Sequence, residues 1–208
     1  MPIEYENRKG ELHFVKAVKT KKGGTRYYIV KDKSKYKTVD LLNEIPTGFE
    51  FYEFPFDGLV SFRKKIKTII TEKDFSILDS VMKKHETIKE YIIDIEPDAL
   101  MLYVSGNYND LLGFIKKEEL KMFQQFDEKL RFEKTENNQF KAQRYCYLGS
   151  YDGWITIETS DNLGYLAEKY CYHADKESLL EFWIEGAEEP EAVLVGEFEG
   201  KPVYGFKR

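Results

Sequence analysis

The order of apolar and polar positions along the chain predicts many short strands. Residues 12–18 and 26–30 are rich in apolar and β-branched or aromatic side chains, and the Gly23-Gly24 pair between them supplies the positive φ angles of a hairpin turn. Residues 91–95 alternate as a half-buried strand does. By the same criteria, strands are expected at 49–54, 59–62, 99–104, 130–133, 140–148, 154–158, 192–198 and 203–206.

Fewer segments show the spacing of a helix. Thr71 is an N-cap candidate with an acidic residue three positions later, and apolar residues then recur at helical spacing as far as His85. Ser34, Asp161 and Asp175 are further candidate caps, the first for a short helix that ends before Pro46. Two more helical segments are expected within residues 108–126.

Because hairpins dominate and strands seldom alternate with long helices, the pattern predicts an α+β fold. We expect mainly antiparallel sheets built from hairpins, with helices packed on one face. The Ser105-Gly106-Asn107 stretch is a candidate boundary between an N-terminal part, residues 1–106, and a C-terminal part, residues 107–208. One continuous domain is the alternative.

Charge is distributed unevenly. The whole chain carries −5, yet residues 1–70 hold 15 Lys and Arg against 9 Asp and Glu, and residues 16–37 hold nine basic residues with one acid, Asp32. This asymmetry is expected either of an ordinary solvated hairpin or of one that meets an anionic partner. The candidate nucleic-acid contacts are Lys16, Lys19, Lys21, Lys22, Arg26, Tyr28, Lys31 and Lys33.

Several classes of protein are disfavoured. Residues 1–9 lack the apolar stretch of a signal peptide, no run reaches the ~18 apolar residues of a membrane span, and two cysteines are too few for a disulfide framework. A cytoplasmic protein with reduced thiols and no membrane contact is therefore expected. No phosphate loop or dinucleotide fingerprint predicts a cofactor. Cys171, His173 and Asp175 lack further ligands nearby, so no metal site is predicted.

The most informative segment is 144–154. Arg144 has the same strand parity as the apolar Phe140, Ala142 and Cys146, and a buried guanidinium must find a carboxylate or carbonyl groups. Asp152 is the nearest carboxylate in sequence, and Asp175 and Glu177 are later candidates, so one hypothesis is a buried Arg–Asp pair that fixes the turn. The other is a notch that binds a small anion or a peptide. Its candidate residues are Arg144, Tyr145, Tyr147, Asp152, Trp154, His173 and Glu177.

This segment also carries a resemblance. With Leu130-Arg131-Phe132 before it, and Tyr170, His173, Glu177 and Ser178 after it, the chain resembles a family of uncharacterised bacterial proteins. That family shares an Arg-Tyr-Cys-Tyr-x-Gly-Ser-x-Asp-x-Trp-like core and a short helical C-terminal part. The family commonly has an acid before the Trp, where this chain has Gly153. The resemblance covers residues 25 to 185 and implies a bacterial origin but no activity.

The function expected from these patterns is binding rather than catalysis. Residues 49–56 are dense in aromatics, and strand alternation cannot bury all of them on one sheet face, so either they fill a two-sided core under helices or some meet a protein partner. The two alternatives are nucleic-acid binding through the basic hairpin, residues 16–37, and an enzyme of unfamiliar type built around Arg144, Asp152 and His173, with Glu177 nearby. The aromatic residues on which the binding hypothesis rests come from the hairpin and from residues 49–56, and they are Tyr27, Tyr28, Phe49, Phe51, Tyr52, Phe54 and Phe56.

Overall fold

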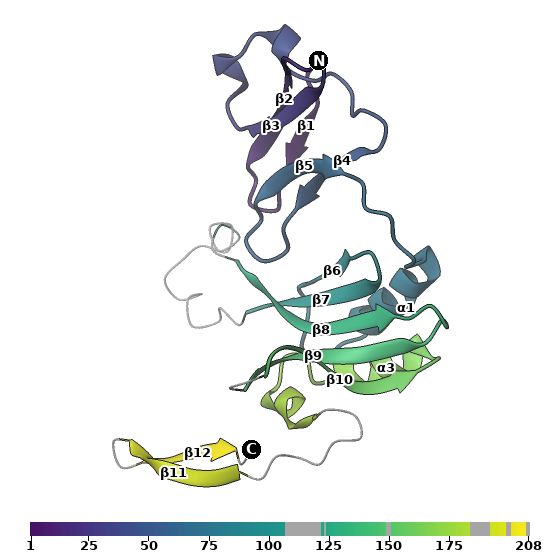
Figure 1. Ribbon diagram of the computed structural model, residues 1–208, viewed down its shortest axis with the longest axis vertical. Helices are drawn as coiled ribbons and strands as arrows, with labels where there is room; N and C mark the ends of the chain where they lie inside the picture. Colours follow the sequence, from purple (N-terminus) through teal and green to yellow (C-terminus); the bar gives the residue numbers. More distant parts are fainter. Residues whose placement is uncertain (107–121, 123, 149–150, 184–191, 199–200, 207–208) are drawn as a thin grey trace.

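The computed structural model describes residues 1–106, 122, 124–148, 151–183, 192–198 and 201–206. Its first part, which we call the N-terminal module, comprises residues 1–64. A three-stranded antiparallel sheet in the order β1-β2-β3 packs there against the hairpin β4–β5 (Figure 1). The strands are β1 (Glu4–Glu6), β2 (Leu12–Lys19), β3 (Thr25–Val30), β4 (Phe49–Glu53) and β5 (Val60–Lys64).

Aromatic rings fill the space between these two small sheets. Tyr27 meets Phe49 and Phe62 edge to face, with centroid separations of 5.0 and 5.4 Å. Tyr5 stacks on Phe51 at 5.2 Å, and Phe51 meets Phe62 at 5.3 Å. Alternation in β4 and β5 brings these rings to one face, where aromatic pairs add stability beyond their buried area. Packing of the two sheets therefore places Tyr27, Phe49 and Phe51 in contact with other rings of the module, although they were among the aromatics that could have met a partner.

The second part is a five-stranded antiparallel sheet in the order β10-β9-β8-β7-β6. Two helices cover one face, and their apolar sides join the sheet in a single core (Figure 1). The fold prediction, α+β with hairpin-built antiparallel sheets and helices on one face, is confirmed. The elements are α1 (Glu72–Lys83), β6 (Tyr91–Ile95), β7 (Ala99–Ser105), β8 (Phe126–Lys134), β9 (Phe140–Leu148), β10 (Tyr151–Ser160) and α3 (Leu163–Cys171).

Local sequence explains where both helices begin. Thr71 Oγ1 accepts from the Asp74 amide at 3.2 Å, and Asp74 Oδ2 accepts from the Thr71 amide at 2.9 Å, which is a reciprocal capping box. Lys134 Nζ lies 2.7 Å from the same Asp74 oxygen and ties the helix start to β8. The second helix is capped by Asn162, one residue after the expected Asp161, because Asn162 Oδ1 accepts from the amide of Tyr165.

Two expected helices are much shorter than predicted. In place of the helix expected from Ser34, the chain forms the 3-10 turns Lys33–Lys35 and Thr38–Asp40, and Asp32 rather than Ser34 caps the first of them. The segment after Asp175 forms the 3-10 helix η4 (Glu177–Glu181). A final hairpin pairs β11 (Ala192–Phe198) with β12 (Lys201–Phe206). The helices expected in 108–126 lie almost entirely outside the described residues.

The chain passes from the sheets of the N-terminal module to the five-stranded sheet before residue 106, the boundary that the sequence predicted. Strand β7 ends at Ser105 and pairs directly with β8, so the strands on both sides of residue 106 belong to one sheet. The passage from the N-terminal module to this sheet falls in residues 65–70. In the described part of the chain, no helix has the length and apolar character needed to cross a membrane.

Candidate functional site

Arg144 is buried on the core face of β9, as its strand parity predicted, with 3% of its surface exposed. Its strongest hydrogen bonds go to carbonyl groups, and the Cys146 thiol and the Trp183 ring, 5.7 Å from Cζ, also lie against it. Nε donates to Phe182 O at 2.5 Å, and the terminal nitrogens donate to Leu180 O and Tyr145 O at 3.2 Å each. Burial lowers the pKa of this guanidinium. Arg144 therefore holds the C-terminal end of η4 and the residue after it against the sheet.

The strand register does not favour the expected Arg144–Asp152 pair. In the β9–β10 ladder Arg144 stands opposite Ile155, whereas Asp152 stands opposite Tyr147. Since residues on one strand alternate between faces, Asp152 has the opposite parity to Arg144. Sequence proximity across a turn was a poor guide to this pairing, because the hairpin register decides which residues share a face.

The other notch residues are likewise divided between the two faces. Tyr145 pairs with Trp154 in the ladder, and their rings meet edge to face at 5.4 Å on the face opposite Arg144. His173 lies next to residues 178–182, which include the carbonyl group of Phe182 that Arg144 binds. Its Nδ1 is 2.7 Å from Ser178 Oγ, and the centroid of its ring is 4.9 Å from that of Phe182.

Glu177 is exposed at the start of η4, and the side chains of Tyr147 and Asp152 lie outside the described residues. The structure brings Arg144 and His173 together around Phe182, whereas Tyr145 and Trp154, the other notch residues of this sheet with described side chains, lie on its opposite face. No group of three or more His, Cys, Asp or Glu within the described residues is arranged to hold a metal.

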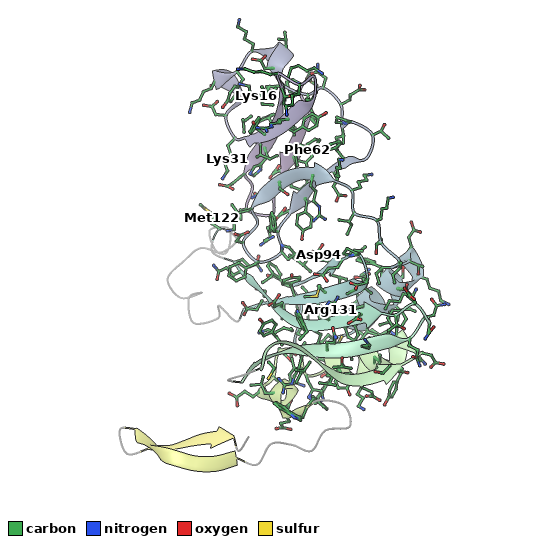
Figure 2. All side chains as sticks on the ribbon, viewed as in Figure 1. Lys16, Lys31, Phe62, Asp94, Met122 and Arg131 are labelled. Atoms are coloured by element: carbon green, nitrogen blue, oxygen red, sulfur yellow. The ribbon has the colours of Figure 1, made fainter. Side chains whose placement is uncertain are left out.

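The opposite face of the five-stranded sheet carries a saturated arginine. Arg131 reaches Glu96 at 3.3 Å, Asp98 at 2.9 Å and Glu133 at 3.0 Å, and it also donates to Gln143 Oε1 at 2.7 Å. Figure 2 labels Arg131 within the sheet. With three carboxylates around it, this guanidinium is a structural tie rather than a receptor for an external anion.

The basic hairpin β2–β3 separates its two tyrosines. Tyr27 points into the aromatic core, whereas Tyr28 is 48% exposed. In the ladder Tyr28 stands opposite Lys16, and Arg26 stands opposite Val18, so these four share the outward face. Figure 2 labels Lys16 toward the outer end of the module.

Several lysines of this hairpin region have local partners. Lys16 Nζ lies 4.6 Å from the Tyr36 ring centroid, and Lys33 Nζ lies 5.1 Å from that of Phe14. Lys31 pairs with Glu11 at 2.8 Å, although both side chains are about half exposed and solvent weakens the pair. Lys19, Lys21, Lys22 and Arg26 are all exposed, the middle two at the turn.

A turn in the N-terminal module presents apolar side chains to solvent. Between β4 and β5, Phe54 is 45%, Phe56 49% and Leu59 60% exposed. Inside the turn, Gly58 N donates to Phe54 O at 2.9 Å and Leu59 N donates to Asp57 Oδ1 at 2.9 Å. The turn is therefore closed by its own hydrogen bonds.

Arg8 holds this turn from outside. Its Nη1 donates to Glu53 Oε1 at 2.8 Å and to Phe54 O at 3.0 Å, and its Nη2 donates to Pro55 O at 2.5 Å. Gly58 has φ +74°, and a Cβ there would lie 3.3 Å from Arg8 Cζ, so the close approach favours glycine. Sequence reasoning missed this role of Arg8, because 46 residues separate it from Phe54 in the turn.

A cleft of about 870 Å³ separates β4–β5 from the first strand of the five-stranded sheet. The Tyr52 hydroxyl crosses it and donates to Asp94 Oδ2 at 2.5 Å; burial and this carboxylate raise the pKa of Tyr52. Figure 2 labels Asp94 where the module meets the sheet. Arg63 also lies in the cleft, with its Cζ 3.3 Å from the Tyr52 ring centroid and its Nε 3.1 Å from Glu50. No sequence motif marked this cleft, because it forms between segments distant in the chain.

Comparison with protein-family models, with curated proteins and with solved structures finds no match for this chain. The resemblance to an uncharacterised bacterial family therefore remains a prediction. Any functional conclusion rests on the geometry above.

Proposed function

We propose that the protein is a binding protein, without catalytic activity of its own, that presents the turn of residues 54–59 to a protein partner. The observation that carries the proposal is the combination of exposure and restraint at this turn. Phe54, Phe56 and Leu59 are each about half or more exposed, yet the backbone between them is held by Arg8, by the Asn7 amide, by the Phe126 backbone N–H and by the turn's own hydrogen bonds.

Restraint of this kind matters for association. A flexible apolar loop loses conformational entropy when a partner binds it, whereas a loop already fixed by its own chain loses little. Aromatic side chains are also the residues that most often dominate the binding energy of an interface. Within the part of the chain that the structure describes, the buried Arg8 Nε has no hydrogen-bond partner, which lowers stability, while the terminal nitrogens of the same guanidinium hold the turn.

The experiment compares the proteins retained from a bacterial lysate by the wild type, by Phe56→Ser/Leu59→Ser and by Val39→Ser. Val39 is a matched control because it is an apolar side chain exposed elsewhere in the same module. We expect a partner bound by the wild type and by Val39→Ser to be lost with the double variant, while all three keep the same unfolding temperature. Identical protein sets for all three would refute the proposal.

A second function is favoured by a separate observation. Tyr28, Lys16 and Arg26 share the exposed face of the β2–β3 hairpin, and single-stranded nucleic acid is bound by aromatic rings that stack on bases beside cations that contact the backbone. On this proposal the phosphate contacts come from this face and from Lys21 and Lys22 at the turn.

Fluorescence anisotropy with a short labelled single-stranded oligonucleotide tests this second function. About three to five phosphate contacts would give a log–log salt slope of about −2 to −3.5. Replacing Lys21 and Lys22 by Gln should flatten that slope by about 1 to 2, and Tyr28→Ala should weaken binding with little change in slope. Lys64→Gln/Lys65→Gln removes the same charge elsewhere and serves as the control. Absence of binding at ~50 mM salt, where phosphate contacts are strong, would exclude this function.

A further inference from the structure

Strand β6 is the edge of the five-stranded sheet, and its hydrogen-bonding parity follows from the bonds that flank it. Ser105 N donates to Glu90 O, and Glu96 N donates to Ala99 O, so these pairs are hydrogen-bonded rungs of the β6–β7 ladder. Such rungs alternate along an antiparallel pair. The amide and carbonyl groups of Tyr91, Ile93 and Ile95 therefore point away from β7, toward the free edge.

The chain itself covers one end of this edge. Ile95 N donates to the side chain of Asp94 at 3.0 Å. Just beyond, Thr68 Oγ1 donates to Glu96 O at 2.8 Å, and Ile69 N donates to Pro97 O at 2.9 Å. Residues 68–70 thus occupy the place of a sixth strand only at this end.

The other end of the edge is open. The described residues provide no hydrogen-bond partner for the outward amide and carbonyl groups of Tyr91 and Ile93. An unpaired strand edge of this kind is a template for another extended backbone. Four of the five residues of β6 also line the cleft next to it, namely Tyr91, Ile92, Asp94 and Ile95.

The cleft also supplies a cation oriented for an acid. Stacking on Tyr52 and the bond from Nε to Glu50 fix the guanidinium plane of Arg63, and its two terminal nitrogens have no partner among the described residues. A fixed guanidinium with two free nitrogens matches the two oxygens of a carboxylate. Lys89 is exposed at the same cleft. Of the four carboxylates in the lining, Glu50 is bound to Arg63, Glu53 to Arg8 and Asp94 to the Tyr52 hydroxyl, and Glu90 is the fourth.

We propose that this cleft binds an extended acidic peptide segment of a partner protein, which pairs with β6 as a sixth strand and places a carboxylate on Arg63. The main-chain bonds to Tyr91 and Ile93 provide affinity, and Arg63 selects the acidic side chain, as in other cases of strand addition. This inference does not depend on the apolar turn or on the basic hairpin, because no residue of either is needed for it.

Amide hydrogen exchange provides the direct test. The probe is a library of acidic octapeptides with Glu or Asp at alternating positions between Val and Thr, compared with the same library carrying Lys. At ~1 mM peptide, well above a weak Kd for such a segment, we expect the acidic library to slow exchange of the Tyr91 and Ile93 amides at least threefold. The Lys library should leave them unchanged. Unchanged exchange with the acidic library would overturn the proposal.

Two variants separate the backbone and charge parts. Ile93→Pro removes the outward amide without removing a bond to β7, so the fold should be kept while anisotropy with a labelled acidic peptide falls at least tenfold. If Ile93→Pro fails to fold, N-methylation of alternate peptide amides removes the same bonds from the other side. Arg63→Gln should weaken the acidic peptide about tenfold, and Lys83→Gln should not. Equal binding by all variants, or protection that arises from a dimer detected by light scattering without peptide, would refute the assignment.

Discussion

The role of Arg144 can be tested by replacing it with methionine. Methionine retains an apolar stem in the core but removes the three bonds from the guanidinium to Phe182 O, Leu180 O and Tyr145 O. A hydrogen bond from a charged donor contributes about 1.5 to 3 kcal/mol, and the two 3.2 Å bonds belong at or below the low end of that range. Water can reach part of the segment after η4 once it is released. We therefore expect a loss of about 3 kcal/mol in the free energy of unfolding.

The loss can be read from urea unfolding followed by tryptophan fluorescence, because the chain's two tryptophans, Trp154 and Trp183, both lie in this part of the fold. For a protein of this size, about 3 kcal/mol corresponds to a fall of about 6 to 12 °C in the unfolding temperature. Arg144→Lys should lose about half as much, since an ammonium group cannot reach all three carbonyl oxygens.

Asp152→Asn is the decisive control. If the carbonyl groups are what Arg144 binds, this variant should change the unfolding free energy by less than about 0.5 kcal/mol, as is usual for substitutions away from such features. A loss at Asp152 as large as that at Arg144 would restore the Arg–Asp pair and refute the assignment of the carbonyl groups as partners. An unchanged Arg144→Met variant would show that the guanidinium does not hold the segment.

Three further predictions concern the same part of the fold. Thr71→Ala should cost about 1 kcal/mol in urea unfolding through loss of the capping box, whereas Thr71→Ser should cost little. For Asp74, burial opposes ionisation, but the bonds from Lys134 and Thr71 outweigh it and lower the pKa of Asp74. Its ionised form thus stabilises the fold above the ordinary carboxyl pKa, and this contribution disappears as the pH falls through the lowered value. Asp74→Asn should accordingly destabilise the protein at pH ~7 and have little effect at pH ~2, and equal losses at both would contradict the assignment. Cys146 and Cys171 are both buried, and burial raises the pKa of Cys171, so a thiol reagent should label neither until the protein unfolds; rapid labelling of the native protein would be the contrary result.

Features of the fold that depend on local sequence could be predicted well. The Gly-Gly turn, the cap at Thr71 and the alternation in residues 91–95 each act over a few neighbours, and the structure has all three elements. The short 3-10 turns after Asp32 and Asp175 were expected as longer helices, because a cap candidate marks where a helix can begin but not how far packing extends it.

The candidate site was harder to predict because it depends on register and on distant contacts. Burial of Arg144 followed from strand parity, but its partners follow from where residues 180–182 cross β9. The density of aromatics in residues 49–56 was visible in the sequence, whereas the separation of Phe49 and Phe51 inside from Phe56 outside depends on the second sheet. Arg8, Arg63 and the free edge of β6 had no sequence signal, since each acts across segments far apart in the chain.

The hold of Arg8 on the β4–β5 turn has a consequence for how the protein is made and monitored in a cell. Arg8 leaves the ribosome long before residues 54–59 do, so the clasp can close only after the whole N-terminal module has been synthesised. Until then Phe54, Phe56 and Leu59 belong to an extended apolar stretch of the kind that chaperones bind. If the finished module binds a partner through this turn, as proposed above, the same side chains would meet a chaperone on the nascent chain first and that partner later, and closure of the Arg8 contacts would separate the two stages.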